Sequence, residues 1–173
     1  MYTIRLTRIL LDRLPKQHAT DDDRTSTTCL GDWFVKPYNV GRNRLLLCTS
    51  SASLLTLLVP AAKLPAVGAR LRETVRDLLY AFGLPLDVIN REVTAMSEHA
   101  FAPTNSRRVL GWMNEMAFTA DGFPVEAFGG EHLVVTAMRL SNALSRPLNY
   151  ASPREVAIRL LTQRRVSPST NIN

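Results

Sequence analysis

The chain has 173 residues, of which 46% are hydrophobic and 21% charged, and its formal net charge is +6. This composition excludes a collagen-like or wholly disordered chain, and the length suits one domain with a substantial core. Two cysteines, Cys29 and Cys48, and three scattered histidines are too few for a disulfide scaffold or a zinc site. We therefore expect neither a metal nor another cofactor.

The distribution of charged and apolar residues predicts a soluble, cytoplasmic protein with no membrane segment. Arg5 and Arg8 interrupt the apolar residues of the N-terminus, which is not typical of a signal peptide. The longest apolar run, 57–62, is far shorter than the roughly 20 residues of a membrane helix. Residues 131–173 carry six arginines and two glutamates. This basic region favours solubility, and attraction for phosphates is the alternative interpretation.

The N-terminal half reads mainly as strands. Alternating apolar and polar residues over 2–7 indicate a half-buried strand, and a short helical turn at 9–14 ends at Pro15. The polar segment 16–28 is expected to be a mobile loop. Short connections rich in turn residues then join three apolar runs, which favours an antiparallel meander. These three strands are predicted at 33–38, 44–49 and 54–59, with Pro37 placing the first at an edge or bulge.

The C-terminal half has apolar residues at helical spacing. Gly83 and Pro85 stop the first helix, and Ser152 with Glu155 forms a capping box before the last. We predict helices at 67–82, 87–96 (with Asp87 as N-cap), 106–120, 133–144 and 152–165, and an extended segment at 99–103. Strands followed by helices favour one α+β domain over 1–165, an antiparallel sheet with helices packed on one face. A disordered tail is expected at 166–173.

The segment 104–115 is the strongest candidate for a binding site. A helix here would place Arg107, Gly111, Asn114 and Phe118 on one face. Glycine in mid-helix costs about 1 kcal/mol relative to alanine, so close approach of another element or a ligand would best explain it. Two arginines beside the free N–H groups of a helix N-terminus would attract an anion. The predicted ligand-binding residues are Thr104, Asn105, Arg107, Arg108 and Asn114.

A purely structural role is the alternative for the same residues. Asn114 would then cap a neighbouring element, and Arg107 would pair with a carboxylate such as Asp32. Secondary candidates for the site are Asp32, Trp33 and Glu115. Asp32 follows a glycine just before an aromatic strand, which is a turn signal, and the sequence offers it no evident base or metal partner.

Four segments together resemble an uncharacterised bacterial domain family: Leu30-Gly31-Asp32-Trp33, residues 44–49, Thr104 to Glu115, and Leu148-Asn149-Tyr150 with Pro153. Members typically carry an L-G-D-W segment and a T-N-x-R-S-V-L-G-S-M-N-D segment. The resemblance covers about residues 1–165. This sequence departs from the pattern at Arg108, Trp112 and Glu115, where the family usually has Ser, Ser and Asp. The resemblance implies one intact bacterial domain and no particular activity.

These observations favour a non-enzymatic cytoplasmic module that binds a partner protein or an anionic ligand. One alternative is a nucleic-acid-binding protein or a component of a toxin–antitoxin pair that uses the Arg-rich C-terminal region. Another is a small phosphate-handling enzyme, in which Arg107 and Arg108 hold phosphate and Asp32 or Glu115 acts as base.

Overall fold

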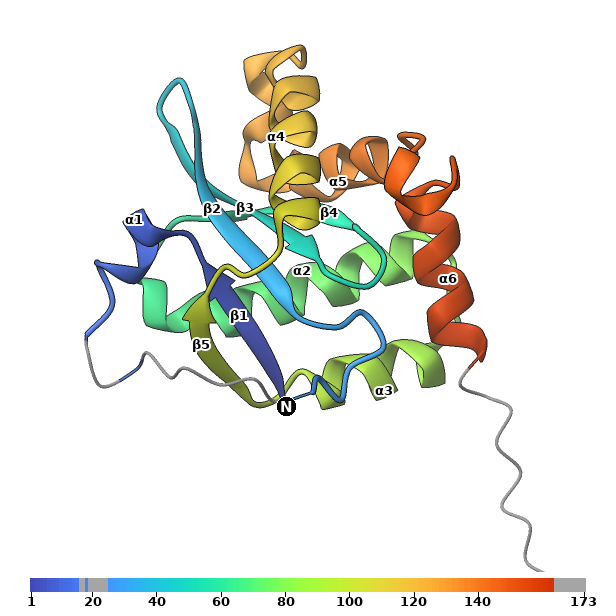
Figure 1. The fold of residues 1–173 in the computed structure, drawn as a ribbon. Helices are drawn as coiled ribbons and strands as arrows, with labels where there is room; N and C mark the ends of the chain where they lie inside the picture. Colours follow the sequence, from blue (N-terminus) through green and yellow to red (C-terminus); the bar gives the residue numbers. More distant parts are fainter. Residues whose placement is uncertain (16–17, 19–24, 164–173) are drawn as a thin grey trace, which may run out of the picture.

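The computed structural model of the chain describes residues 1–15, 18 and 25–163. Its centre is a five-stranded sheet in the order β4-β3-β2-β1-β5 (Figure 1). The strands are β1 (Tyr2–Leu6), β2 (Trp33–Val40), β3 (Asn43–Ser50), β4 (Thr56–Pro60) and β5 (His99–Pro103). The α+β class is therefore confirmed, with most of the sheet from the first half of the chain and most helices from the second.

The sheet is mixed, so the prediction of a purely antiparallel sheet is wrong. The antiparallel part is the β2–β3–β4 meander, as its short connections indicate. β1 runs parallel to both of its neighbours, with Ile4 opposite Trp33 on one side and Phe101 on the other. Parallel strands need long crossover connections, and such connections leave no local turn signal in the sequence.

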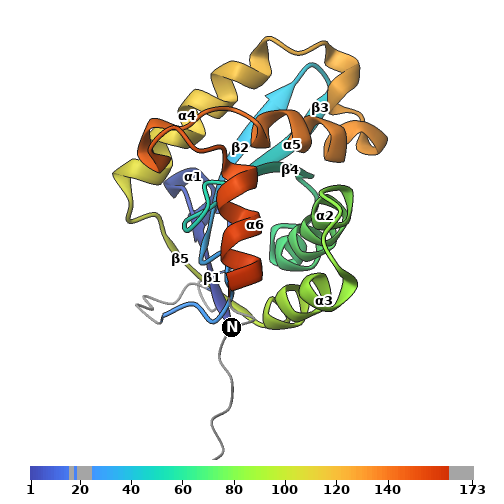
Figure 2. The same ribbon diagram turned by 90° about the vertical axis from the view of Figure 1, so that its right-hand side faces the viewer.

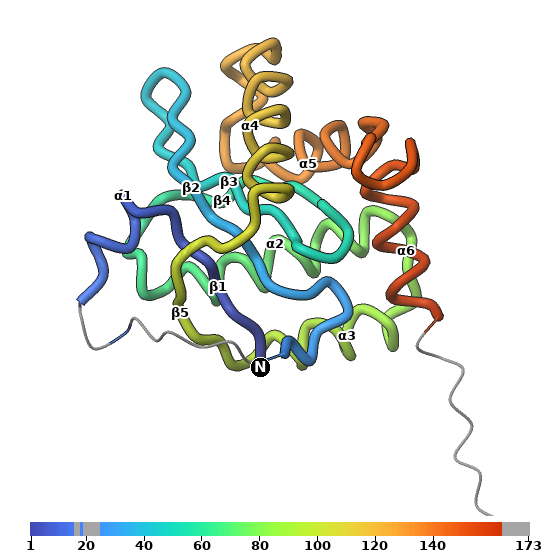
Figure 3. The backbone as a smooth tube through the Cα atoms, viewed as in Figure 1, coloured from blue at the N-terminus to red at the C-terminus, as the bar shows by residue number. Residues whose placement is uncertain are grey.

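The distal half of β2 has a neighbour on one side only. β2 pairs with β3 along its whole length but with β1 only over 33–35. Pro37 lies in the half that β1 leaves uncovered, which agrees with its expected place at an edge. The tip of the β2–β3 hairpin therefore stands clear of β1 (Figure 3).

The helices follow the predicted spans closely. They are α1 (Arg8–Leu11), α2 (Val67–Ala81), α3 (Leu86–Ala95), α4 (Arg107–Asp121), α5 (Leu133–Ser141) and α6 (Pro153–Gln163). The capping box of α6 forms, with Glu155 N donating to Ser152 Oγ at 3.2 Å and Ser152 N to Glu155 Oε2 at 2.9 Å. Asp87 lies in the first turn of α3, after Pro85, instead of serving as its N-cap. Over the described residues, no helix has the length and apolarity to cross a membrane.

Helices cover both faces of the sheet, so the prediction of packing on one face is wrong (Figure 2). One core joins α2, α3 and α6 to β1 and to one face of the meander. The other joins α4 to the opposite face, where Trp112 and Met113 pack with Phe34 and Leu47. α5 contributes to both cores beside β4. The physical reason is the continuous apolar run of β3, since successive side chains point to opposite faces and both must be buried.

Two further predictions concern segments that lie largely or wholly outside the described residues. Of the predicted mobile loop 16–28, the structure describes His18 and residues 25–28. The predicted tail 166–173 lies entirely outside.

Candidate functional site

The connection from β5 to α4 fixes where the candidate site begins. Thr104 N donates to Leu6 O at 3.2 Å, which continues the alignment of β5 with β1. Ser106 is extended and caps the helix, and its Oγ accepts a hydrogen bond from Val109 N at 3.3 Å. Because the helix begins at Arg107, one residue after the predicted start, both adjacent arginines lie in its first turn.

The polar groups of this first turn face outward. Asn105, Arg107 and Arg108 are exposed, and Thr104 is half-buried. Within the described ranges, neither guanidinium has a hydrogen-bond or ion-pair partner, and the first turn of α4 contains no acidic residue. The suggested pairing of Arg107 with Asp32 is therefore absent. Two unneutralised cations at the positive end of a helix dipole favour an anion there.

One exposed row continues along the helix from this end. We call Arg107, Gly111, Asn114 and Phe118 the α4 stripe; all four are exposed, while the opposite face packs into the core. The prediction that these four residues share one face of the helix is confirmed. The phenyl ring of Phe118 is 81% exposed although it is large and apolar. Apart from its chain neighbours and the backbone of its own helix, no described atom would lie within 4 Å of a Cβ added to Gly111.

The side of the stripe that faces β2 is polar. Lys36 Nζ donates to Asn114 Oδ1 at 2.8 Å, and Tyr38 OH donates to Asp121 Oδ1 at 2.8 Å. Burial lowers the pKa of Lys36, and the Asp121 carboxylate partly offsets this effect. Burial and the hydrogen bond to Asp121 raise the pKa of Tyr38. Sequence reasoning missed Lys36, although strand alternation places it on the same face as Phe34.

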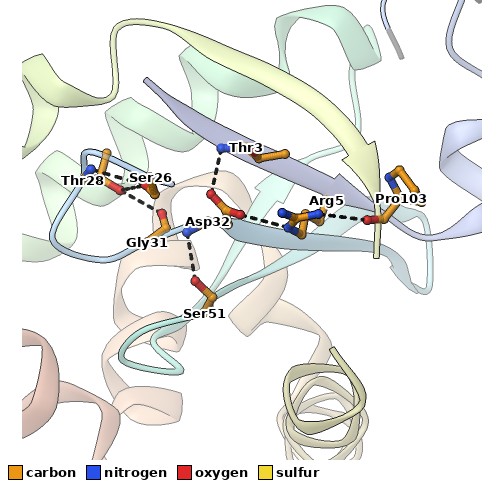
Figure 4. A network of polar contacts seen from close by, with 8 residues as sticks. All are labelled: Thr3, Arg5, Ser26, Thr28, Gly31, Asp32, Ser51 and Pro103. Carbon is orange, nitrogen blue, oxygen red and sulfur yellow. Dashed lines mark hydrogen bonds and ion pairs between the residues drawn. The ribbon is translucent and has the colours of Figure 1, made fainter. Parts of the chain in front are cut away.

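Asp32 belongs to a separate, internal network (Figure 4). Its Oδ1 accepts a hydrogen bond from Thr3 N at 3.0 Å, and its Oδ2 pairs with Arg5 Nε at 2.9 Å. Its own N–H donates to Ser51 Oγ at 2.9 Å. Arg5 Nη1 also reaches Pro103 O at 3.5 Å. Both carboxylate oxygens are thus occupied in joining β2 to β1, and this network leaves Asp32 no role at α4.

The other two secondary candidates, Trp33 and Glu115, lie in different parts of the molecule. Trp33 is fully buried in the core on the α2 side. Glu115 is exposed on α4. Trp112, one of the departures from the family pattern, is buried and donates from Nε1 to Leu54 O at 2.9 Å. The structure therefore brings together Thr104, Asn105, Arg107, Arg108, Asn114 and Glu115 on or beside α4, and leaves Asp32 and Trp33 elsewhere.

Comparison with known proteins gives a family for this chain. The model of a domain of unknown function, DUF6933, matches residues 3–156. The chain belongs to the DUF6933 family. The match runs from β1 into the first turn of α6 and includes both the Asp32 network and the α4 stripe. No curated protein and no solved structure matches the chain.

This DUF6933 domain also contains a buried carboxylate that sequence reasoning missed. Glu92 on α3 is 1% exposed and accepts hydrogen bonds from Cys29 N at 2.9 Å and Leu30 N at 3.0 Å. It therefore anchors the turn before Asp32 to α3. The available signal was its position within the apolar face of α3, between Ile89 and Val93.

Proposed function

We propose that this DUF6933 domain is a cytoplasmic, non-enzymatic binding module that recognises an acidic segment of a partner protein along the α4 stripe. The observation that carries the proposal is Gly111. It lowers the stability of α4 by about 1 kcal/mol relative to alanine. No described atom approaches it closely enough to require a glycine. An exposed glycine that internal packing does not require leaves room for the backbone of a partner to lie close to the helix.

The rest of the stripe suggests what the partner must offer. Arg107 and Phe118 are 11 residues apart, which is about 16 Å along a helix. An extended peptide of about five residues spans that length. Carboxylates at one end would meet Arg107 and Arg108, and an apolar side chain at the other would cover Phe118. Lys36 and Asn114 would provide polar contacts between the two ends.

Other observations bear on the compartment and on the rival functions. Cys48 is a buried thiol without a disulfide, in keeping with a reducing compartment. The phosphate-handling alternative loses support from Asp32, because Arg5 and Thr3 occupy both of its oxygens. Nucleic-acid binding remains an outcome of the test, since two unpaired arginines also suit phosphates.

Selection of displayed random peptides tests the proposal. The wild-type domain should enrich peptides in which acidic residues precede or follow an apolar residue by a few positions. The variant Arg107→Gln/Arg108→Gln should lose the preference for acidic residues, because each charge-assisted hydrogen bond is worth about tenfold in affinity. Phe118→Ala should lose the apolar preference.

The matched control is Arg159→Gln, which removes an exposed arginine from α6. It should enrich the same peptides as the wild type. The proposal fails if the arginine variant selects an unchanged set of peptides. It also fails if the domain binds mixed-sequence DNA or RNA at about 50 mM salt through these arginines, with an affinity that falls steeply as salt rises.

A further inference from the structure

A second surface lies on the other side of the sheet from α4. A groove of about 510 Å³ is formed by α1, the distal half of the β2–β3 hairpin and the segment 61–64. Pro37 and Leu46, which line it, are opposite each other in the sheet, and Leu46 belongs to the core on the α2 side. The groove is thus separate from the α4 stripe. Its volume is within the range of about 300–1,000 Å³ that is usual for small-molecule sites.

Apolar side chains and polar groups both line the groove. Ile9 of α1 forms part of one wall and is 60% exposed, which is costly for a large aliphatic side chain unless something covers it. Pro37 and Leu46 provide further apolar surface on the sheet side. The polar contributions come from Asn39, Arg13 and Arg44. An apolar body with a polar group placed toward these three residues would match this lining.

The charged groups of the groove have one sign. Arg13 and Arg44 are both exposed, and over the described residues neither guanidinium has an ion-pair or hydrogen-bond partner. Among the described residues that line the groove, none is acidic. Asp12, the acidic neighbour of Arg13 in the chain, is already paired with Arg8 Nε at 3.1 Å. The groove therefore offers two guanidiniums without a counter-charge.

The backbone adds hydrogen-bonding groups at the same place. Thr7 N donates to Val35 O, so the carbonyl of Val35 points toward β1. The alternation of a strand then directs the N–H and C=O of Asn39 to the same side, where β1 no longer pairs with β2. Asn39 also faces Arg44 across the hairpin.

We propose that this groove binds a small amphipathic anion, an apolar chain or ring that carries a carboxylate or phosphate group. The apolar part would cover Ile9, Pro37 and Leu46. The anionic group would pair with Arg13 and Arg44, whose planar guanidiniums match a carboxylate or phosphate in a bidentate manner. This site is independent of the α4 stripe and of the function proposed there.

Isothermal titration of the full chain with octanoate, octyl phosphate and octanol tests the site. At least one of the two anions should bind with a Kd below about 1 mM, and octanol should bind at least tenfold more weakly. The anion that binds more tightly identifies the head group. Arg13→Gln and Arg44→Gln should each weaken binding about tenfold, because each removes a charge-assisted hydrogen bond. Ala62→Trp, which fills the groove from an exposed position, should abolish it.

Arg42→Gln is the matched control, because Arg42 is exposed at the turn of the same hairpin and does not line the groove. It should bind like the wild type, and circular dichroism should show every variant folded. Absence of binding by both anions up to about 1 mM overturns the proposal. Equal binding of octanol, or binding that is unchanged in both the arginine variants and Ala62→Trp, overturns it as well.

Discussion

Two helical glycines show that the surroundings of β1 are closely packed, whereas the outer face of α4 is open. A Cβ on Gly68, in the first turn of α2, would lie 2.5 Å from Nδ1 of His99. That imidazole is flanked by the rings of Tyr2 and Phe101, with centroids at 5.9 and 5.1 Å. A Cβ on Gly111 would meet no described atom outside its chain neighbours and the backbone of its own helix. Internal packing therefore requires the first glycine and gives no reason for the second.

The arginines of the two regions differ in the same way. Arg5 lies on β1 with its side chain only 9% exposed, and Asp32 neutralises it. Arg107 and Arg108 lie in water without a described partner. Groups that satisfy one another stabilise the fold, whereas groups left unsatisfied are available for a ligand. Four predictions test or sharpen this contrast.

The largest effect is expected from Asp32→Ala. The variant leaves the Arg5 guanidinium buried without a counter-charge and the Thr3 N–H without its acceptor. We expect the free energy of unfolding to fall by about 3–4 kcal/mol, measured by denaturant titration. Asp12→Ala is the control, since the side chains of the Arg8–Asp12 pair are 86% and 62% exposed and such pairs contribute about 0.5 kcal/mol or less. Equal losses in the two variants would contradict the contrast.

Gly68→Ala should come next, with a loss of about 2 kcal/mol, because the added methyl group displaces a ring that its neighbours hold in place. A double-mutant cycle with His99→Ala checks the cause. In the His99→Ala background the second substitution should cost almost nothing. An undiminished cost there would mean that the clash with the imidazole is not responsible.

Gly111→Ala should have the opposite sign. The free energy of unfolding should rise by about 1 kcal/mol, because helix propensity improves and no described atom opposes the methyl group. The same variant should bind the peptides selected at the α4 stripe more weakly. Thermal unfolding measures the first effect and peptide titration the second. A destabilised Gly111→Ala variant would show that packing within the molecule requires the glycine.

The smallest effect concerns pH. Burial, assisted by the charge of Arg72, lowers the pKa of His99 in the folded state below the ordinary 6.5. Between the folded pKa and 6.5 the unfolded chain binds more protons, so the free energy of unfolding rises with pH in this window and declines on acidification from 6.5. Comparison of unfolding curves above and below this window for wild type and His99→Gln measures the effect.

Much of the local structure followed from the sequence because its causes are local. Helical spacing placed Arg107 and Phe118 on one face of α4, and the structure shows that this face is exposed. Turn residues marked the β2–β3–β4 meander. Ser152 with Glu155 marked the start of the last helix, because a capping box uses residues within one turn.

Tertiary structure alone decided the features that join distant parts of the chain. The parallel pairing of β1 with β2 and β5 depends on contacts across long connections, and no local pattern encodes them. The partner of Asp32 is Arg5 instead of Arg107, because the strand order places β1 beside β2. Tertiary packing likewise decides which residues approach Gly111, since a sequence lists the residues but not which of them come close to a given backbone position.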